Sequence, residues 1–177
     1  MKKFLLTLSM TALLLFTAGC SCPFSDKTAD SKSQMSTAKA SSAEVAPDFS
    51  YKELGSGKTM RLNDLKGKPV FINFWATWCP PCVGELPHIE KKYAEYKDRM
   101  HFVILSVDDN EQEPARFIQS KGYTFPAAYG DHQALGRAYG IDAIPASYII
   151  SADGHIVAST VGSMNESSLD AFLQKAF

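Results

Sequence analysis

The sequence predicts an α/β fold in which one central mixed β-sheet is flanked by helices. From residue 47 to the C-terminus, short apolar runs rich in β-branched and aromatic residues alternate with segments of helical periodicity. Residues 69–74 are almost continuously apolar, which is typical of a central strand covered on both faces. The 177 residues, 45% of them hydrophobic, suffice for one core but hardly for two.

Each element has a local signal. Gly55-Ser-Gly57 between two strand-like runs predicts an N-terminal β-hairpin, and Asp153-Gly154 predicts a second hairpin. Gly122 and Gly140 are expected to end helices. The expected strands are residues 49–53, 59–62, 69–74, 101–107, 125–129, 146–150 and 156–161. The expected helices are residues 80–97, 114–121, 133–139 and 166–177, and the charges of residues 90–97 are expected to form a solvated face with local ion pairs.

The N-terminus has the pattern of a secretory signal peptide, predicted here for residues 1–19. Lys2 and Lys3 precede an apolar run, residues 4–16, that is too short to cross a membrane comfortably. Thr17-Ala-Gly-Cys20 resembles a bacterial lipobox, although Thr17 stands where Leu is usual. The resemblance implies lipidation at Cys20 and a tether to a membrane that faces an extracytoplasmic compartment. Cleavage nearby by an ordinary signal peptidase, which would release the protein, is the alternative.

Residues 20–46 are predicted to be the lipid-anchor cysteine followed by a disordered linker to a single domain, residues 47–177. The segment is rich in Ser, Ala, Thr and Lys and has almost no large apolar residues, so it cannot bury enough surface to offset ordering. Two readings of Cys22 stay open: a disulfide with Cys20 if that residue is not lipidated, or a free thiol beside the anchor. The formal net charge of −1 and the lack of a dense Lys/Arg run argue against a nucleic-acid partner.

The motif with the clearest chemistry is Cys79-Pro-Pro-Cys82, which follows an apolar strand and opens a helix. Residues three apart on a helix are neighbours, so a small adjustment brings the two sulfur atoms within disulfide reach. The positive end of a helix also favours a thiolate. A disulfide that closes so small a loop adds little stability, which favours thiol–disulfide exchange over a structural role. Zinc would need two further ligands at suitable spacing, so neither a metal nor a cofactor is expected.

Residues 70–82 resemble the active-site strand and turn of the thioredoxin superfamily. Pro87 matches a proline of the active-site helix, and residues 139–150 resemble the segment that contains the cis-proline of that fold. Asn73, Glu85 and the long segment 108–130, a central βα insertion, resemble the TlpA/ResA-like (DsbE/CcmG-like) extracytoplasmic reductases, which include those of cytochrome c maturation. The resemblance covers residues 47–177.

The resemblance assigns roles around the cysteine pair. It implies that Cys79 is an exposed nucleophile and that Cys82 is the shielded resolving thiol of a redox disulfide. Trp78 would form an apolar docking surface beside the nucleophile. Pro145, in the cis form, would lie against the cysteines and leave the backbone of Ile144 free to pair with an extended substrate.

The same resemblance makes Glu85 a catalytic acid or base. Asn73 stands where cytosolic thioredoxins usually have a buried Asp, and an amide cannot take over its proton transfer. The implied partners are a membrane thiol electron donor of the DsbD/CcdA type and a disulfide-bearing exported protein, with an apocytochrome c as one candidate.

Two other functions are open at this level. A thiol peroxidase has a similar layout, but its pattern wants Thr or Ser three residues before the reactive Cys, where this chain has Ala76 and then Thr77. A copper or protein chaperone would be non-enzymatic, and the cysteine spacing does not match that of copper carriers on this fold.

Overall fold

The computed structural model describes residues 44–177. The predicted signal peptide, Cys20, Cys22 and the predicted linker up to residue 43 lie outside the described residues. Among residues 44–177, no helix combines the length and the apolar character needed to cross a bilayer.

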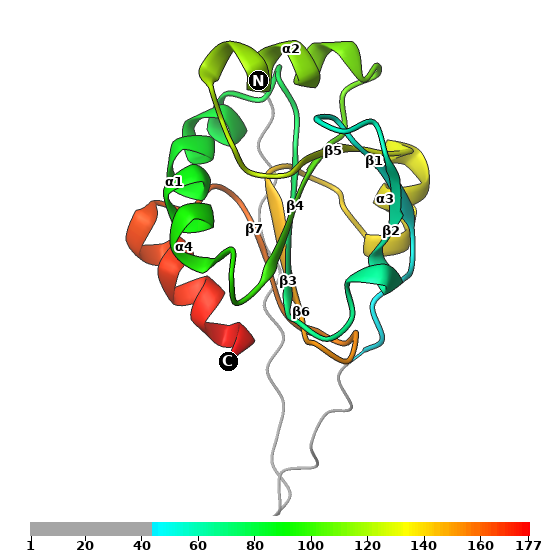
Figure 1. Ribbon diagram of the computed structural model, residues 1–177, viewed down its shortest axis with the longest axis vertical. Helices are drawn as coiled ribbons and strands as arrows, with labels where there is room; N and C mark the ends of the chain where they lie inside the picture. Colours follow the sequence, from blue (N-terminus) through cyan, green and yellow to red (C-terminus); the bar gives the residue numbers. More distant parts are fainter. Residues whose placement is uncertain (1–43) are drawn as a thin grey trace, which may run out of the picture. The chain divides into compact units, whose positions relative to one another are not determined.

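A seven-stranded mixed sheet forms the centre of the domain, with the strand order β2-β1-β5-β4-β3-β6-β7 (Figure 1). Its strands are β1 (Ser50–Glu53), β2 (Thr59–Arg61), β3 (Val70–Trp75), β4 (His101–Ser106), β5 (Ala127–Tyr129), β6 (Ala146–Ile150) and β7 (Ile156–Val161). β3 is parallel to β4 and antiparallel to β6, and the β1–β2 hairpin has Ser50 opposite Arg61. The predicted mixed sheet and N-terminal hairpin are therefore confirmed.

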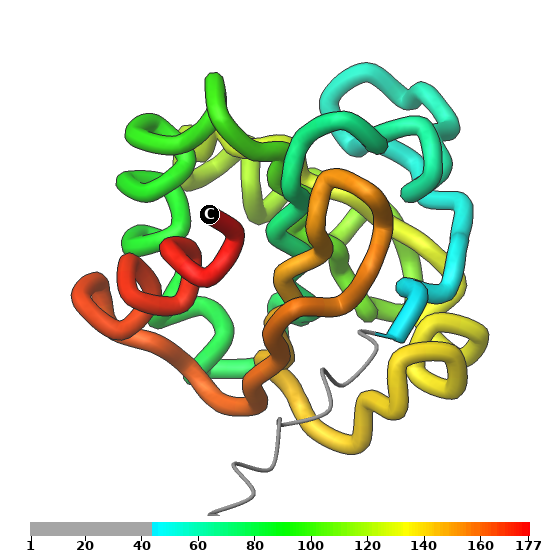
Figure 2. The backbone as a smooth tube through the Cα atoms, turned by 90° about the horizontal axis from the view of Figure 1, so that it is seen from below, coloured from blue at the N-terminus to red at the C-terminus, as the bar shows by residue number. Residues whose placement is uncertain are grey.

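Helices cover both faces of this sheet. They are α1 (Pro80–Tyr96), α2 (Gln112–Lys121), α3 (His132–Tyr139) and α4 (Glu166–Leu173). α1 and α4 lie side by side on one face, and α3 lies on the other (Figures 1 and 2). Every residue of β3 is buried, because the alternating side chains of this strand enter the core on each face in turn. The strand that leads to the Cys-Pro-Pro-Cys motif is thus held from both sides.

The predicted central βα insertion consists of α2 and β5, which come between β4 and α3. β5 adds to the free edge of β4 in parallel, and β1 then pairs antiparallel with β5. α2 lies at the end of the sheet where β3 stops, and its Phe117 packs against Trp75 with ring centroids 5.7 Å apart. The insertion therefore both widens the sheet and covers the end of β3.

Several boundaries differ from the prediction. α2 begins two residues earlier than expected because Pro114 occupies the first helical turn, where a missing N–H costs nothing. α4 ends at Leu173 and tightens into a 3₁₀ turn (Gln174–Ala176). A further 3₁₀ turn over Leu62–Leu65 was not predicted.

The charged segment 90–97 is only partly the solvated face that the sequence predicts. The side chain of Lys92 is buried, and its ammonium group contacts Glu95 at 2.7 Å and Asp170 of α4 at 2.9 Å. The prediction was wrong for Lys92 because its second partner is 78 residues away and reaches it only when α4 packs on α1.

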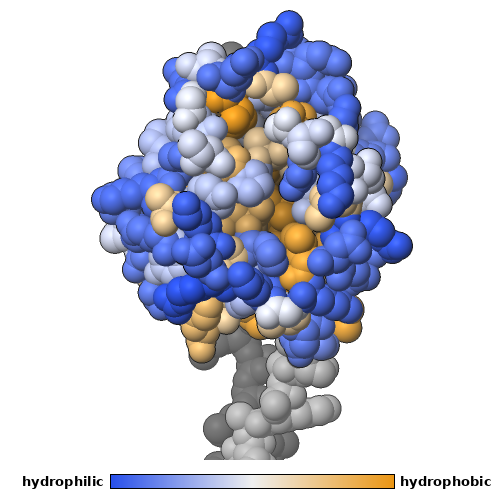
Figure 3. Space-filling model, in the orientation of Figure 1, coloured by the Kyte–Doolittle hydropathy of each residue, from blue (hydrophilic) through white to orange (hydrophobic). Residues whose placement is uncertain are grey.

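A groove of about 640 Å³ lies between α2, the tip of the β1–β2 hairpin and the segment before β5. Leu54, Ile118 and Phe125 are among its apolar lining residues. Figure 3 shows apolar side chains in a hollow of this face, between hydrophilic margins. Neither cysteine of the Cys-Pro-Pro-Cys motif lines this groove.

Candidate active site

The two cysteines of the motif form a disulfide at the junction between β3 and α1. The Cα atoms of Cys79 and Cys82 are 5.3 Å apart. Cys79 is the N-cap residue of α1, and its sulfur accepts a hydrogen bond from the backbone N–H of Cys82 at 3.3 Å. Pro80 and Pro81 fit the first helical turn, where backbone N–H groups lack intrahelical acceptors. The helix therefore directs its positive end at the sulfur of Cys79.

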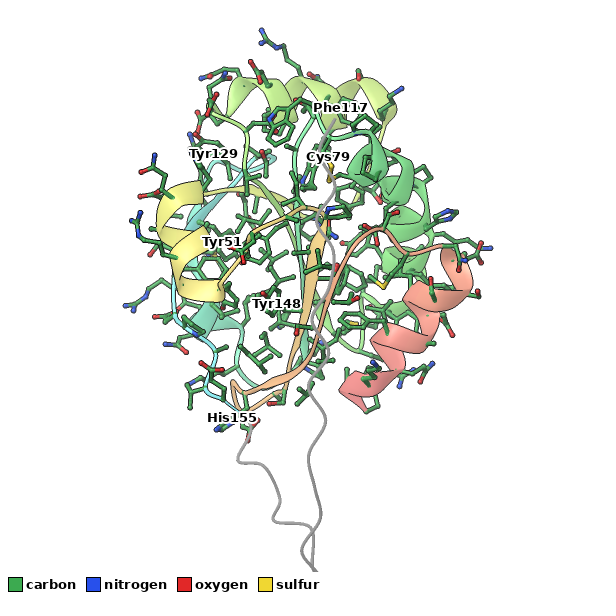
Figure 4. The ribbon with its side chains drawn as sticks, turned by 180° about the vertical axis from the view of Figure 1, so that it is seen from behind. Tyr51, Cys79, Phe117, Tyr129, Tyr148 and His155 are labelled. Carbon is green, nitrogen blue, oxygen red and sulfur yellow. A yellow bond between two sulfur atoms is a disulfide. The ribbon has the colours of Figure 1, made fainter. Side chains whose placement is uncertain are left out.

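Cys79 is less exposed than an attacking nucleophile was expected to be. Its exposed fraction is 5%, against 1% for Cys82, so the expectation of an exposed thiol needs correction. In the disulfide form the sulfur of Cys79 is bonded to Cys82, belongs to the apolar core, and lies 3.8 Å from the carbonyl oxygen of Ile144. Cys79 is nevertheless the more exposed of the two cysteines, as the resemblance implies. Figure 4 shows Cys79 at the end of the sheet that α2 covers with its Phe117.

The segment before β6 completes the surroundings of the disulfide. The Ile144–Pro145 peptide bond is cis, and the carbonyl oxygen of Pro145 accepts the N–H of Gly162 at 2.8 Å. Trp78, directly before Cys79, has 64% of its surface exposed, so it is not a core residue. The structure thus brings the cysteines and the Ile144–Pro145 segment together, with an exposed aromatic side chain next to them in the chain.

Glu85 lies one helical turn beyond Cys82 and is 1% exposed, which excludes a solvated surface position. Its carboxylate accepts the backbone N–H of Met164 at 3.0 Å and the side-chain amide of Asn73 at 3.4 Å. Burial raises the pKa of Glu85 to about 7, although these two hydrogen bonds act in the opposite direction. A carboxyl group with this pKa can accept or release a proton near neutral pH.

Asn73 links the two strands behind Glu85. Its amide nitrogen also donates to the hydroxyl of Ser147 at 2.9 Å, directly across the β3–β6 pair. The amide does not titrate, so among the groups that Asn73 contacts Glu85 is the one that can hold a proton near pH 7.

Two contributors to this site were not predicted from the sequence. Met164 supplies a backbone donor to Glu85 from the loop before α4, and no sequence pattern announces such a contact. Asp108 is fully buried and binds Thr77, two residues before Cys79. Its position just after the strand next to β3 was the available signal, because the carboxyl ends of parallel strands share one edge of a sheet.

The contact between Thr77 and Asp108 also bears on the peroxidase alternative. Ala76 has no hydroxyl group, and the hydroxyl of Thr77 donates to Asp108 at 2.6 Å. Neither residue therefore presents a free hydroxyl to a peroxide beside Cys79. Within residues 44–177, no three His, Cys, Asp or Glu side chains are grouped so that they could hold a metal ion.

Comparisons with known proteins agree with this geometry. The family described as Redoxin matches residues 39–173. Thiol-disulfide oxidoreductase ResA of Bacillus anthracis is 36% identical over 131 residues, covering 73% of this chain and 75% of its own. The ResA of Halalkalibacterium halodurans is 34% identical over 174 residues, covering 98% and 94%.

Among solved structures, the pneumococcal exposed lipoprotein thioredoxin Etrx1 from Streptococcus pneumoniae strain TIGR4 superposes with a TM-score of 0.65. It is 26% identical, and the alignment covers 73% of this chain and 99% of that protein. The disulfide at a helix N-terminus, the neighbouring cis-proline and these similarities lead to one conclusion. The chain belongs to the Redoxin family and is a TlpA/ResA-like thiol-disulfide oxidoreductase of the thioredoxin superfamily.

Proposed function

We propose that this oxidoreductase reduces disulfides of exported proteins in an extracytoplasmic compartment. The observation that carries the proposal is the Cys79–Cys82 disulfide at the start of α1, with the carbonyl oxygen of Ile144 3.8 Å from the sulfur of Cys79. A sulfur placed there, next to a second sulfur and a backbone segment that can receive a peptide, has what disulfide exchange requires.

The reaction proceeds in two exchange steps. The Cys79 thiolate attacks one sulfur of the partner disulfide, the partner S–S bond breaks, and the departing partner sulfur takes up a proton. The Cys82 thiolate then attacks the Cys79 sulfur of this mixed disulfide and releases the second partner thiol. The two electrons given to the partner are restored by a membrane thiol donor of the DsbD/CcdA type, which reduces Cys79–Cys82 again.

Substrate docking is assigned to Trp78, Ile144 and Pro145. The exposed face of Trp78 offers apolar contact beside the reacting sulfur. An extended peptide that pairs with the backbone of Ile144 would bring its disulfide to Cys79, since the Ile144 carbonyl already borders that sulfur. An apocytochrome c, unfolded and bearing two neighbouring cysteines, is one substrate of this kind.

Trapping of intermediates tests the roles of the two cysteines. Cys82→Ser should accumulate mixed disulfides through Cys79 in cells, because the resolving thiol is missing. Cys79→Ser should accumulate none, and it serves as the matched control. Mass spectrometry of the trapped species identifies the partner, and an apocytochrome c among them would support that substrate. Equal trapping by both variants would overturn the assignment.

Glu85 is assigned the role of accepting the Cys82 proton when that thiol attacks the mixed disulfide. Glu85→Gln should slow the release of a reduced peptide from a preformed mixed disulfide by about a hundredfold at pH 8, the size of a general-base contribution. The step near pH 7 in the rate profile should disappear, because the group with a pKa of about 7 is gone. Glu113→Gln, at an exposed position of α2, is the control. An unchanged rate profile for Glu85→Gln would exclude this role.

The lipid anchor at Cys20 is a separate proposal. It is supported by the Thr17-Ala-Gly-Cys20 pattern and by the similarity to an exposed lipoprotein. Cys20→Ala should abolish detergent-phase partitioning and the mass increase of a diacylglycerol group, whereas Cys22→Ala, two residues away, should leave both unchanged. Equal partitioning of wild type and Cys20→Ala would contradict the anchor.

The direction of electron flow is tested by the reduction potential of Cys79–Cys82. A reductant should have a potential well below that of strong oxidants of the DsbA type, and a value near about −120 mV would reverse the proposed direction.

A further inference from the structure

A fully buried acid lies behind the turn that carries Cys79. Asp108 has no exposed surface and follows the end of β4. β4 is the parallel neighbour of β3, with Ser106 opposite Trp75, so the chain leaves both strands at the same edge of the sheet. Asp108 is thereby placed next to the first residues of the active-site turn.

The Asp108 carboxylate is surrounded by donors. The backbone N–H of Thr77 points at both carboxylate oxygens, 3.2 and 3.1 Å away, and the Thr77 hydroxyl donates to one of them at 2.6 Å. The hydroxyl of Ser106 donates to the other oxygen at 2.7 Å, and its oxygen accepts the backbone N–H of Asp108 at 3.0 Å. All three groups donate, so the two carboxylate oxygens of Asp108 accept every one of these bonds. These bonds offset the cost of burying the acid.

Between β3 and α1, Ala76 and Cys79 are held in the core, and the two residues between them are Thr77 and Trp78. The backbone N–H of Cys79 bonds to the carbonyl of Ala76 at 3.2 Å, and Trp78 projects into solvent. Thr77 lies between Ala76 and Trp78 in this turn, and its backbone N–H and its hydroxyl are both directed at Asp108. A side chain from the neighbouring strand therefore fixes the turn two residues before the reactive sulfur.

We propose that Asp108 is a positioning residue for Cys79. By binding Thr77, it holds the turn so that the Cys79 sulfur stays at the positive end of α1, within reach of the Cys82 N–H and beside Ile144. The inference rests on the proposed role of Cys79 as the attacking thiol and deepens it. A turn released from Asp108 would let the sulfur drift from the donors that stabilise its thiolate, so the thiolate would form at higher pH.

Thr77→Val separates positioning from charge, because it keeps the shape, the backbone N–H and the Asp108 carboxylate but removes the hydroxyl donor. The reduced full-length protein is treated with iodoacetamide over a range of pH, and alkylation of Cys79 is followed by mass spectrometry of its peptide. The pH midpoint should rise by about 0.5–1 unit, the size expected for one lost hydrogen bond. Thr77→Ser restores the hydroxyl and should keep the wild-type midpoint. Glu85, the other buried acid near the cysteines, is unchanged in both variants.

The chain offers a matched control in Thr124, which makes the same pair of contacts with another carboxylate. Its N–H and its hydroxyl donate to Glu90 at 2.9 and 2.6 Å, on a loop outside the active-site turn. Thr124→Val should leave the Cys79 midpoint unchanged. A second arm uses Asp108→Asn, in which adding Thr77→Val should shift the midpoint less than it does in the wild-type background, because the two residues act as one unit.

Three results would overturn the inference: a wild-type midpoint in Thr77→Val, an equal shift in Thr77→Ser, or an equal shift in Thr124→Val. Melting temperatures of all variants are recorded in parallel. A variant that only loses stability has a lower melting temperature and an unchanged Cys79 alkylation midpoint, whereas a loss of positioning shifts the midpoint. Failure of the proposed function shows up elsewhere, in the trapping experiment with Cys82→Ser, which does not depend on Thr77.

Discussion

Helix α1 buries one acidic and one basic side chain, Glu85 and Lys92, seven residues apart on one face, and surrounds them differently. Lys92 meets two carboxylates, those of Glu95 and Asp170. Glu85 meets only uncharged donors, the N–H of Met164 and the amide of Asn73. The hydrogen bonds from Lys92 to Glu95 and Asp170 raise the pKa of Lys92 and preserve its charge, whereas burial raises the pKa of Glu85 to about 7 and disfavours its charge.

The comparison shows that burial of an ionisable group has different consequences with and without a partner of opposite charge. At the C-terminal end of α1, opposite charges meet and join α1 to α4. At the N-terminal end, next to the disulfide, an acid is buried without a positive partner. That arrangement lowers the free energy of unfolding at neutral pH, but it yields a carboxyl group that titrates near pH 7. The following predictions test the contrast.

The largest effect should come from Glu85→Gln, measured as the pH dependence of stability. Between pH 4.5 and 7 the folded protein holds a proton on Glu85 that the unfolded chain has lost, so the free energy of unfolding falls as pH rises through this window. This group accounts for about 3 kcal/mol between pH 4 and pH 8. In Glu85→Gln the free energy of unfolding should not fall by this amount between pH 4 and pH 8. Urea unfolding of both proteins at the two pH values measures the difference.

Comparing wild type with Glu85→Gln cancels the contribution of every other titrating group to the pH dependence of stability. Burial lowers the pKa of His101, which acts with the opposite sign, because the unfolded chain then binds the additional proton. His101 is present in both proteins, so its effect cancels in the difference. If the difference between wild type and Glu85→Gln were the same at pH 4 and pH 8, the uncompensated burial of Glu85 would be refuted.

Local sequence signals were sufficient for most of the fold. The continuous apolar run of β3, the glycines that end α2 and α3, and the Asp153-Gly154 turn each specify their element through a few neighbouring residues. The same holds for the Cys-Pro-Pro-Cys motif at the start of α1. Such features are set by nearest neighbours in the chain, which the sequence displays directly.

What the sequence could not supply are contacts that exist only after distant elements pack. Asp170 contacts Lys92 from another helix, and Asp108, which follows β4, contacts Thr77, which follows the neighbouring strand β3. The low exposure of Cys79 has the same origin, since Ile144 arrives from a segment 65 residues away. A charged residue in a helix is normally solvated, so only the fold reveals the exceptions.

A smaller effect is expected from Lys92→Met, which keeps the length of the side chain but removes the charge that joins α1 to α4. The free energy of unfolding should fall by about 1–2 kcal/mol, because two charge-assisted hydrogen bonds are lost while the partly exposed carboxylates regain water. Unlike the Glu85 effect, this loss should be equal at pH 6 and pH 8, since hydrogen bonds lower the pKa of Asp170 and raise the pKa of Lys92, and neither group changes its charge in this range. A loss confined to one of these pH values would contradict the comparison.

The smallest effect should come from Lys91→Gln, one residue away and also joined to α4. Lys91 pairs with Glu166, and both side chains are largely exposed, so water already solvates each charge when the pair is open. We therefore expect urea unfolding of Lys91→Gln to match that of wild type, and added salt to remove any remaining difference. The deficit of Lys92→Met should persist in the same salt, because the Lys92 side chain is buried whereas that of Lys91 is largely exposed. If Lys91→Gln were as destabilised as Lys92→Met, burial would not be the property that distinguishes the two lysines, and the contrast with Glu85 would lose its physical basis.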